Sequence, residues 1–134
     1  MRKKIMVVDD DSDILITVKN IFEREGYEVF TVDSGKKCYE MLLNNEIPDL
    51  ILLDIMMPGM SGWMLSDRIK ENPSWKDIPV VFLTVRTDSF AKKAGDTLCE
   101  EYIEKPFDVE DLKKRIDKIF KKCNSKSSKL SIIK

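Results

Sequence analysis

The chain has 134 residues, of which 43% are hydrophobic and 35% charged, as expected of one globular domain with a full core. No apolar run approaches the ~20 residues that cross a bilayer, and a formal net charge of −1 gives no overall attraction for nucleic acid, so neither a membrane nor specific DNA binding by this chain is expected. Histidine is absent, which excludes histidine-based nucleophiles. The three cysteines are widely spaced, so neither a zinc site nor a disulfide framework is supported, and reduced thiols in a cytoplasmic protein are expected.

The first strand and helix are marked by clear signals. A strand is expected over residues 5–8, and apolar residues then recur at helical spacing over 14–22. Asp11 or Ser12 is placed to cap this helix, and Gly26 is placed to end it. The chain therefore opens with a strand followed by a helix.

The same alternation continues along the chain. Strands are expected over 27–32, 49–54, 78–84 and 101–104. Each is followed by an expected helix, near 35–44, over 62–71, over about 88–96 and, after the last strand, at the end of the domain. Such alternation predicts an α/β fold, a single doubly wound parallel sheet of five strands with helices on both faces. The second and fifth strands are more polar, as edge strands would be, which favours the flavodoxin-like order 2-1-3-4-5.

The composition changes near the end of the chain. Up to residue 122 nothing interrupts the alternation, whereas residues 123–134 are rich in serine and lysine. We therefore expect one domain over 1–122, and a flexible tail or the start of a linker over 123–134.

Polar residues stand where the expected strands end. Asp9 and Asp10 follow the first strand, Asp54 ends the most hydrophobic one, and Thr84 and Lys105 end the fourth and fifth. The carboxyl ends of parallel strands meet at one edge of a sheet, where ligands bind. A buried carboxylate at Asp54 is costly unless a cation or hydrogen bonds compensate it. These residues are therefore expected to form one site.

The residue types at these strand ends suit phosphoryl chemistry. Three carboxylates repel one another unless a cation lies among them, and oxygen ligands alone favour Mg²⁺. Lys105 and the hydroxyl of Thr84 could hold phosphoryl oxygens, and Asp54 could act as a nucleophile that gives an acyl phosphate. Each residue alone has an ordinary structural explanation, such as a helix cap or a turn, so the prediction depends on the combination.

Four motifs occur in order, namely "VVDDD", "LILLDIMMPGMSG", "VVFLT" and "YIEKPF". Together they resemble the receiver domain of two-component response regulators, over about residues 3–121. The resemblance implies that Asp54 is the phosphoacceptor and that Asp10 binds Mg²⁺ directly, with Asp9 helping through water and the backbone carbonyl of Met56 completing the metal site. It implies that Thr84 and Lys105 bind the phosphoryl oxygens and that Tyr102 is the aromatic residue coupled to Thr84. It also implies a cis peptide at Lys105-Pro106.

The resemblance also implies a function for the domain over 1–122. It would be a phosphorylation-switched signalling module that accepts a phosphoryl group from the phosphohistidine of a histidine kinase or a histidine phosphotransfer protein. It would catalyse its own phosphorylation and dephosphorylation rather than act as an enzyme on a separate substrate. Phosphorylation would shift the population of two states of the face made by the fourth helix, fifth strand and fifth helix, through which a homodimer could form.

The sequence departs from the family pattern at two places. Val85 follows Thr84 where a small residue is usual, so we expect its stiff side chain to narrow the approach to Asp54. Leu98-Cys99 replaces the usual Gly-Ala, which affects the fourth helix and the output face.

Three other classes of function fit the residues less well. The main alternative is a Mg²⁺-dependent aspartyl-phosphate phosphohydrolase, but Met56 stands where such enzymes carry a second aspartate and it cannot transfer a proton. In a flavin-binding electron carrier the run "DDDSD" would repel the flavin phosphate. An interaction module that is never phosphorylated would not need the complete set of acceptor, metal ligands and phosphoryl-binding residues.

Overall fold

Strands and helices alternate in the computed structural model, which describes the backbone of residues 2–84 and 101–133 and the side chains of residues 2–83 and 103–122. The elements are β1 (Lys4–Val8), α1 (Ser12–Arg24), β2 (Glu28–Val32), α2 (Gly35–Leu43), β3 (Leu50–Asp54), α3 (Gly62–Glu71), β4 (Val80–Thr84), β5 (Glu101–Glu104) and α5 (Val109–Ile133). The predicted alternation is confirmed for these elements. The helix expected near 88–96, Val85 and Leu98-Cys99 lie outside the described residues.

The five strands form one parallel sheet in the order β2-β1-β3-β4-β5. β3 lies in the middle and all five of its residues are buried, because it has a strand on each side and a helical layer on each face. The more polar strands β2 and β5 lie at the two edges. The predicted fold class and strand order are therefore confirmed.

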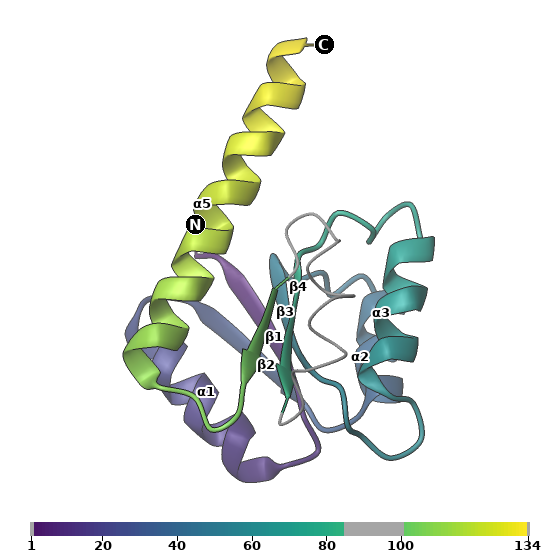
Figure 1. Ribbon diagram of the computed structural model, residues 1–134. Helices are drawn as coiled ribbons and strands as arrows, with labels where there is room; N and C mark the ends of the chain where they lie inside the picture. The colour runs from purple at the N-terminus through teal and green to yellow at the C-terminus, as the bar shows by residue number, and fades with distance from the viewer. Residues whose placement is uncertain (1, 85–100, 134) are drawn as a thin grey trace.

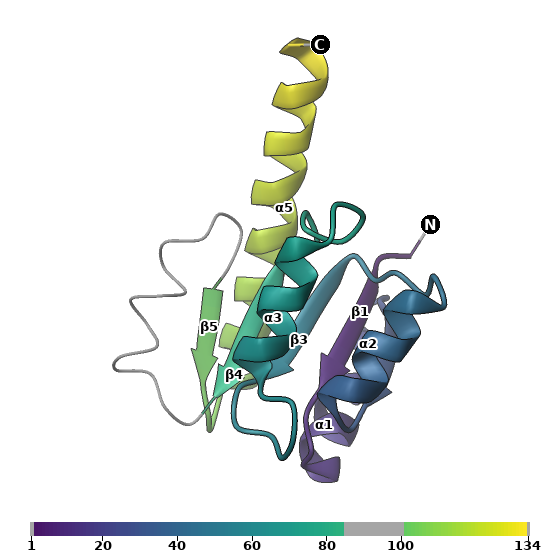
Figure 2. The same ribbon diagram turned by 90° about the vertical axis from the view of Figure 1, so that its right-hand side faces the viewer.

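Two helical layers cover the sheet. α1 and α5 lie against one face, and α2 and α3 against the other (Figures 1 and 2). Each layer has its own core, because side chains alternate between the two faces along a strand: Leu52 of β3 packs with α1 and α5, whereas Leu53 packs with α2 and α3. Both cores support the sheet from which the site is built.

Short polar residues begin the helices. The side chain of Asp11 accepts a hydrogen bond from the backbone N–H of Asp13, while Ser34 and Ser61 cap α2 and α3 in the same way. Gly26 follows the end of α1 with a φ of +94°, a conformation that glycine adopts without steric cost.

The last helix continues further than the sequence suggested. α5 runs to Ile133, so the backbone of 123–133 is helical where a flexible tail or linker was expected. No glycine or proline interrupts residues 107–134, so no residue in this stretch forces the helix to end. In Figure 1 this end of α5 extends beyond the sheet, away from the edge where the strands finish. The division of the chain at residue 122 stays a prediction.

None of the helices in the described part of the chain is long and apolar enough to cross a lipid bilayer.

Candidate functional site

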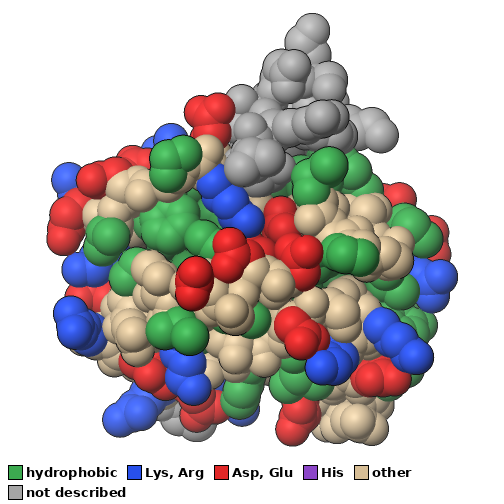
Figure 3. Space-filling model, turned by 90° about the horizontal axis from the view of Figure 1, so that it is seen from below, with side chains coloured by type: hydrophobic (Ala, Val, Ile, Leu, Met, Phe, Trp, Pro, Cys, Tyr) green, Lys and Arg blue, Asp and Glu red, His purple; other side chains and the backbone are tan. Residues whose placement is uncertain are grey.

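The carboxyl ends of the strands meet at the lower end of the molecule as drawn in Figure 1. Asp9 and Asp10 follow β1, Asp54 ends β3, and Lys105 follows β5. Figure 3 looks onto this end and shows acidic side chains gathered near its middle, beside a basic one. Residues up to 96 positions apart in sequence are thus brought to one edge of the sheet.

Three of the predicted residues form an acidic cluster. One carboxylate oxygen from each of Asp9, Asp10 and Asp54 lies within 4.8 Å of the others. Asp9 is fully buried and Asp54 is 5% exposed, whereas Asp10 is open to solvent. The cluster therefore has two buried members and one member at its mouth.

Asp54 is held where ionisation is unfavourable. The pKa of its carboxyl group is raised from 3.8 to about 6, chiefly by burial and next by the neighbouring carboxylate of Asp9. The ammonium group of Lys105 and the backbone N–H of Met56 lower the pKa, and Asp10 raises it again. The Met56 N–H donates to Asp54 Oδ1 at 3.3 Å. Lys105 and the N–H of Met56 thus compensate part of the cost of burying this carboxylate.

Lys105 contacts Asp9 more closely than Asp54. Its Nζ donates to Asp9 Oδ2 at 2.7 Å and lies 3.7 Å from Asp54 Oδ1. The Lys105 side chain is only 14% exposed. The Lys105-Pro106 peptide bond at the base of this arrangement is cis, as the family resemblance implied.

The other oxygen of Asp9 is also engaged. Oδ1 of Asp9 accepts a hydrogen bond from the backbone N–H of Asp11 at 2.9 Å. The side chain of Asp11 is turned to the start of α1, where it caps the helix. Asp11 is therefore a structural residue within the acidic run, and it does not join the cluster.

The residues present fit a small divalent cation. The cluster offers carboxylate oxygens from three side chains and no nitrogen or sulfur ligand, which is the chemistry that Mg²⁺ prefers. The ammonium group of Lys105 already lies among these carboxylates, so positive charge is stabilised at this position. Asp9, Asp10 and Asp54 are the side chains that would hold the ion.

One positioning residue was missed from the sequence. A Cβ atom on Gly62 would lie 2.3 Å from the carbonyl oxygen of Asp54 and 2.8 Å from the Cα of Ile55. Only glycine lets the start of α3 lie this close to the backbone of Asp54 and Ile55. The signal was a glycine inside the expected helix 62–71, where it is a poor helix former.

Thr84 and Tyr102 lie on the two strands that follow β3 in the sheet. Thr84 ends β4, whereas Tyr102 lies within β5 opposite Phe82 of β4, and the side chains of both lie outside the described part. Met56 lies in the loop after β3 and is 49% exposed. A hollow of about 510 Å³ opens here, lined by Asp10, Ile55, Met56, Met57, Pro58 and Ser61.

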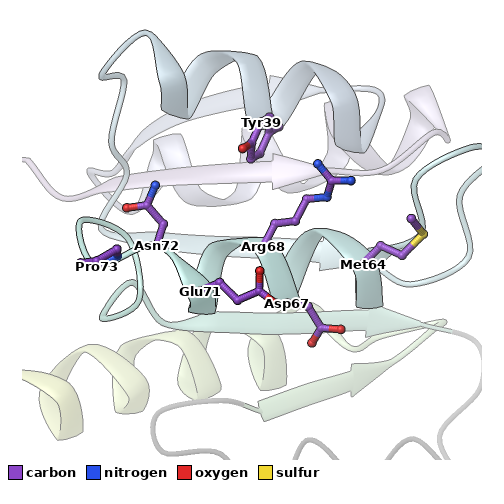
Figure 4. Close-up of a pocket in the computed structure, with 7 residues that line it drawn as sticks. All are labelled: Tyr39, Met64, Asp67, Arg68, Glu71, Asn72 and Pro73. Carbon is purple, nitrogen blue, oxygen red and sulfur yellow. The ribbon is translucent and has the colours of Figure 1, made fainter.

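A second hollow lies away from the strand ends, between α2 and α3. It has a volume of about 590 Å³, and Figure 4 shows the side chains that line it. The Arg68 guanidinium lies 5.6 Å from the ring centre of Tyr39. None of the predicted site residues lines this hollow, so it is separate from the acidic cluster.

The family model of the response regulator receiver domain matches residues 5–117. The phosphate regulon transcriptional regulatory protein PhoB of Rhizobium meliloti (strain 1021) is 32% identical over 124 residues, which are 92% of this chain and 54% of that protein. Transcriptional regulatory protein CrdR of Helicobacter pylori is 39% identical over 121 residues, 90% of this chain and 56% of that protein. The chain thus spans about half the length of these curated relatives.

A solved structure gives the same result for the fold. The N-terminal domain of a response regulator receiver protein from Methanoculleus marisnigri JR1 is 41% identical, with a TM-score of 0.69. The match covers 85% of this chain and 93% of that one. The family match, the relatives and the shared fold agree with the resemblance drawn from the four motifs, and the chain belongs to the family of response regulator receiver domains.

Proposed function

We propose that this receiver domain is switched by transfer of a phosphoryl group to Asp54 in the presence of Mg²⁺. The observation that carries the proposal is the cluster of Asp9, Asp10 and Asp54 with the Lys105 ammonium 3.7 Å from Asp54 Oδ1. Phosphorylation of an aspartate is characteristic of the family, and Asp54 is the buried carboxylate at the end of the central strand.

The chemistry needs a donor with a good leaving group. A carboxylate oxygen of Asp54 attacks the phosphorus of a phosphohistidine, the new O–P bond forms as the P–N bond breaks, and the imidazole keeps the electron pair. The chain contains no histidine, so the donor is a histidine kinase or a histidine phosphotransfer protein.

Negative charge on the phosphoryl group must be balanced during this step. Mg²⁺ held by Asp9, Asp10 and Asp54 would supply part of the positive charge. Lys105 supplies another part from within the site, and the hydroxyl of Thr84 donates a hydrogen bond to a phosphoryl oxygen. The N–H of Met56, already bonded to Asp54 Oδ1, keeps the acceptor carboxylate oriented.

The output follows from a change of charge at Asp54. Thr84 moves toward the phosphoryl group and Tyr102 follows. This movement shifts the population between two states of the face that includes β5 and α5. A homodimer through this face is part of the proposal. The relatives are named as transcriptional regulators, and this chain spans about half of each. That this chain does not itself bind DNA specifically stays a prediction. A cytoplasmic location stays a prediction.

Intact-mass measurement after treatment with acetyl phosphate and Mg²⁺ tests the proposal. One acid-labile phosphoryl group should be added to the wild type and none to Asp54→Asn. Asp67→Asn is the matched control, because Asp67 is an exposed aspartate of α3 that lines the separate hollow. Equal labelling of Asp54→Asn and wild type would show that Asp54 is not the acceptor.

A phosphohydrolase remains the alternative with the nearest chemistry. Repeated turnover of a phosphate monoester such as p-nitrophenyl phosphate, lost in Asp54→Asn, would favour it over the proposed switch.

A further inference from the structure

Positive charge is concentrated in the last helix. Residues 113–134 contain nine lysines and arginines and a single acidic residue, Asp117, which gives this segment a net charge of +8. Since the whole chain has 23 basic and 24 acidic residues, the rest carries 14 and 23, a net charge of −9. The overall charge of −1 is therefore the sum of an acidic body and one strongly basic segment.

Five of the basic residues share one side of the helix. They follow one another at steps of three or four residues, which places them in one row along an α-helix: Arg115, Lys118, Lys122, Lys126 and Lys129. The backbone is helical over this whole stretch, so this basic row is roughly 20 Å long. Because α5 projects beyond the sheet, the row runs from the body of the domain onto the projecting part (Figures 1 and 2).

Most of the charge in the basic row is not neutralised by the protein. Arg115 pairs with Asp111 at 3.0 Å. Lys118 and Lys122 are exposed, and within the described part of the chain neither has an ion-pair partner. Lysines four residues apart on a helix repel each other, as Lys122 does with Lys118 and Lys126. A bound polyanion would remove this repulsion.

More positive charge lies beside the same helix. The Nζ atom of Lys3 lies 5.7 Å from the ring centre of Phe120 in α5. Lys3 is flanked in sequence by Arg2 and Lys4, and all three residues are exposed. The acidic cluster lies at the opposite end of the molecule, so the basic row is separate from the proposed phosphorylation site (Figure 1).

The chemistry of the segment favours a nucleic-acid backbone over a lipid surface. A helix that lies in a membrane interface inserts an apolar face, but Ile116, Ile119 and Phe120 of α5 are buried in the core of the domain. Residues 124–131 place one asparagine and four serines among the lysines. Such side chains commonly contact phosphate oxygens in protein–DNA complexes, together with lysine.

We propose that the basic row of α5 is a docking surface for duplex nucleic acid, which it binds through the backbone phosphates and without sequence specificity. The inference goes beyond the proposed function, because it uses none of the residues of the acidic cluster. It agrees with the expectation that this chain does not bind DNA specifically, because phosphate contacts carry no sequence information.

Fluorescence anisotropy with two labelled DNA duplexes of equal length and unrelated sequence tests the proposal. The full chain should bind both duplexes equally well. If the four lysines of the row each neutralise one phosphate, log affinity should fall with log salt concentration with a slope of roughly −3.6. The affinity should therefore drop roughly a hundredfold between about 50 and 200 mM salt. Binding to only one of the two duplexes would overturn the inference.

Two double variants locate the binding on the row. Lys118→Gln combined with Lys122→Gln removes the two described lysines, and Lys126→Gln combined with Lys129→Gln removes the two on the projecting part. Glutamine is a good helix former, so the helix is retained. Each variant should make the salt slope less steep by about two, because it removes two phosphate contacts. An unchanged slope in either variant would contradict the proposed surface.

Lys36→Gln combined with Lys76→Gln is the matched control. Both lysines are exposed and lie outside α5, and the change in net charge is the same as in the row variants. The control should keep the wild-type slope. A reduction as large as that of the row variants would mean that binding follows net charge alone, and the inference would be wrong.

Other partners of the row give different results. Sedimentation with phosphatidylserine vesicles, without any binding to duplex, would show a lipid-binding helix and overturn the proposal. Self-association at low salt, again without binding to duplex, would assign the row to the acidic body of a second copy and would also overturn it. Labelling by acetyl phosphate should be the same in wild type and in both row variants, so failure of this inference leaves the proposed function at Asp54 untouched.

Discussion

Asp54 couples the chemistry of the site to the stability of the fold. Its pKa is raised from 3.8 to about 6, chiefly by burial, so the folded protein favours the protonated form. The protonated carboxyl contributes stability that is fully present below about pH 3.8 and is lost as the pH rises through about 6. At neutral pH, without metal, the ionised side chain therefore destabilises the fold.

Replacing Asp54 should then stabilise the metal-free protein in a pH-dependent way. We expect Asp54→Asn to raise the free energy of unfolding by roughly 1–3 kcal/mol at pH 7.5 and by much less at pH 4. Urea denaturation at the two pH values measures both differences, with Asp67→Asn as the control that should change neither. A loss of stability at pH 7.5 would show that Asp54 is a structural partner.

Gly62 is predicted to be essential for a different reason. In Gly62→Ala the new methyl group would press on backbone atoms, 2.3 Å from the Asp54 carbonyl oxygen and 2.8 Å from the Ile55 Cα. We expect a loss of about 1–3 kcal/mol of stability, and slower labelling by acetyl phosphate because Asp54, the proposed acceptor, is displaced.

Gly26→Ala is the matched control for that experiment. At Gly26 the positive φ of +94° costs energy, but no atom lies within 4 Å of the new Cβ. Stability should fall by about 1 kcal/mol while labelling stays at the wild-type rate. Unchanged labelling in Gly62→Ala as well would show that the contact does not position Asp54.

Residue types and strand ends could be predicted from sequence, but individual contacts could not. Asp9, Asp10, Asp54 and Lys105 were all expected at one edge because a parallel sheet brings its carboxyl ends together. The Lys105 Nζ lies 2.7 Å from Asp9 Oδ2 and 3.7 Å from Asp54 Oδ1. A sequence pattern does not encode so small a difference between two distances. Gly62 is the last residue of the motif that contains Asp54, but the motif does not show that the two backbones approach too closely for a Cβ atom.

At the scale of an element, the start of α1 contains an aspartate that stabilises the helix and is not part of the acidic cluster. Asp11 stands in the acidic run, yet its side chain accepts the N–H of Asp13 and caps α1. We expect Asp11→Ala to reduce stability by about 1 kcal/mol and to leave Mg²⁺ affinity unchanged. Ser34→Ala removes the cap of α2 and should give the same result. A marked loss of Mg²⁺ binding in Asp11→Ala alone would make Asp11 a ligand.

The end of a helix could be predicted from sequence where a particular residue stops the helix. Gly26 ends α1 as expected, and the predicted helix over 62–71 has the bounds of α3. The last helix was different, because serine and lysine indicate a linker by composition but neither residue stops a helix. α5 therefore continues to Ile133.

For the whole molecule, the site and the far end of α5 lie at opposite ends (Figure 1). Within the part of α5 whose side chains are described, the buried residues are Leu112, Ile116, Ile119 and Phe120. All of them pack in the core shared with α1, which supports the sheet beneath the cluster. This arrangement predicts that the domain is complete before the helix leaves the body.

Truncation tests that prediction. A chain that ends at Lys122 retains every buried residue described in α5, so its melting temperature should stay within ~3 °C of the full chain, with the same labelling by acetyl phosphate. A chain that ends at Arg115 loses Ile116, Ile119 and Phe120, and each such loss removes several kcal/mol of packing. The shorter chain should therefore not fold. If the chain ending at Lys122 unfolds as readily as the one ending at Arg115, residues after 122 belong to the core and the domain boundary is wrong.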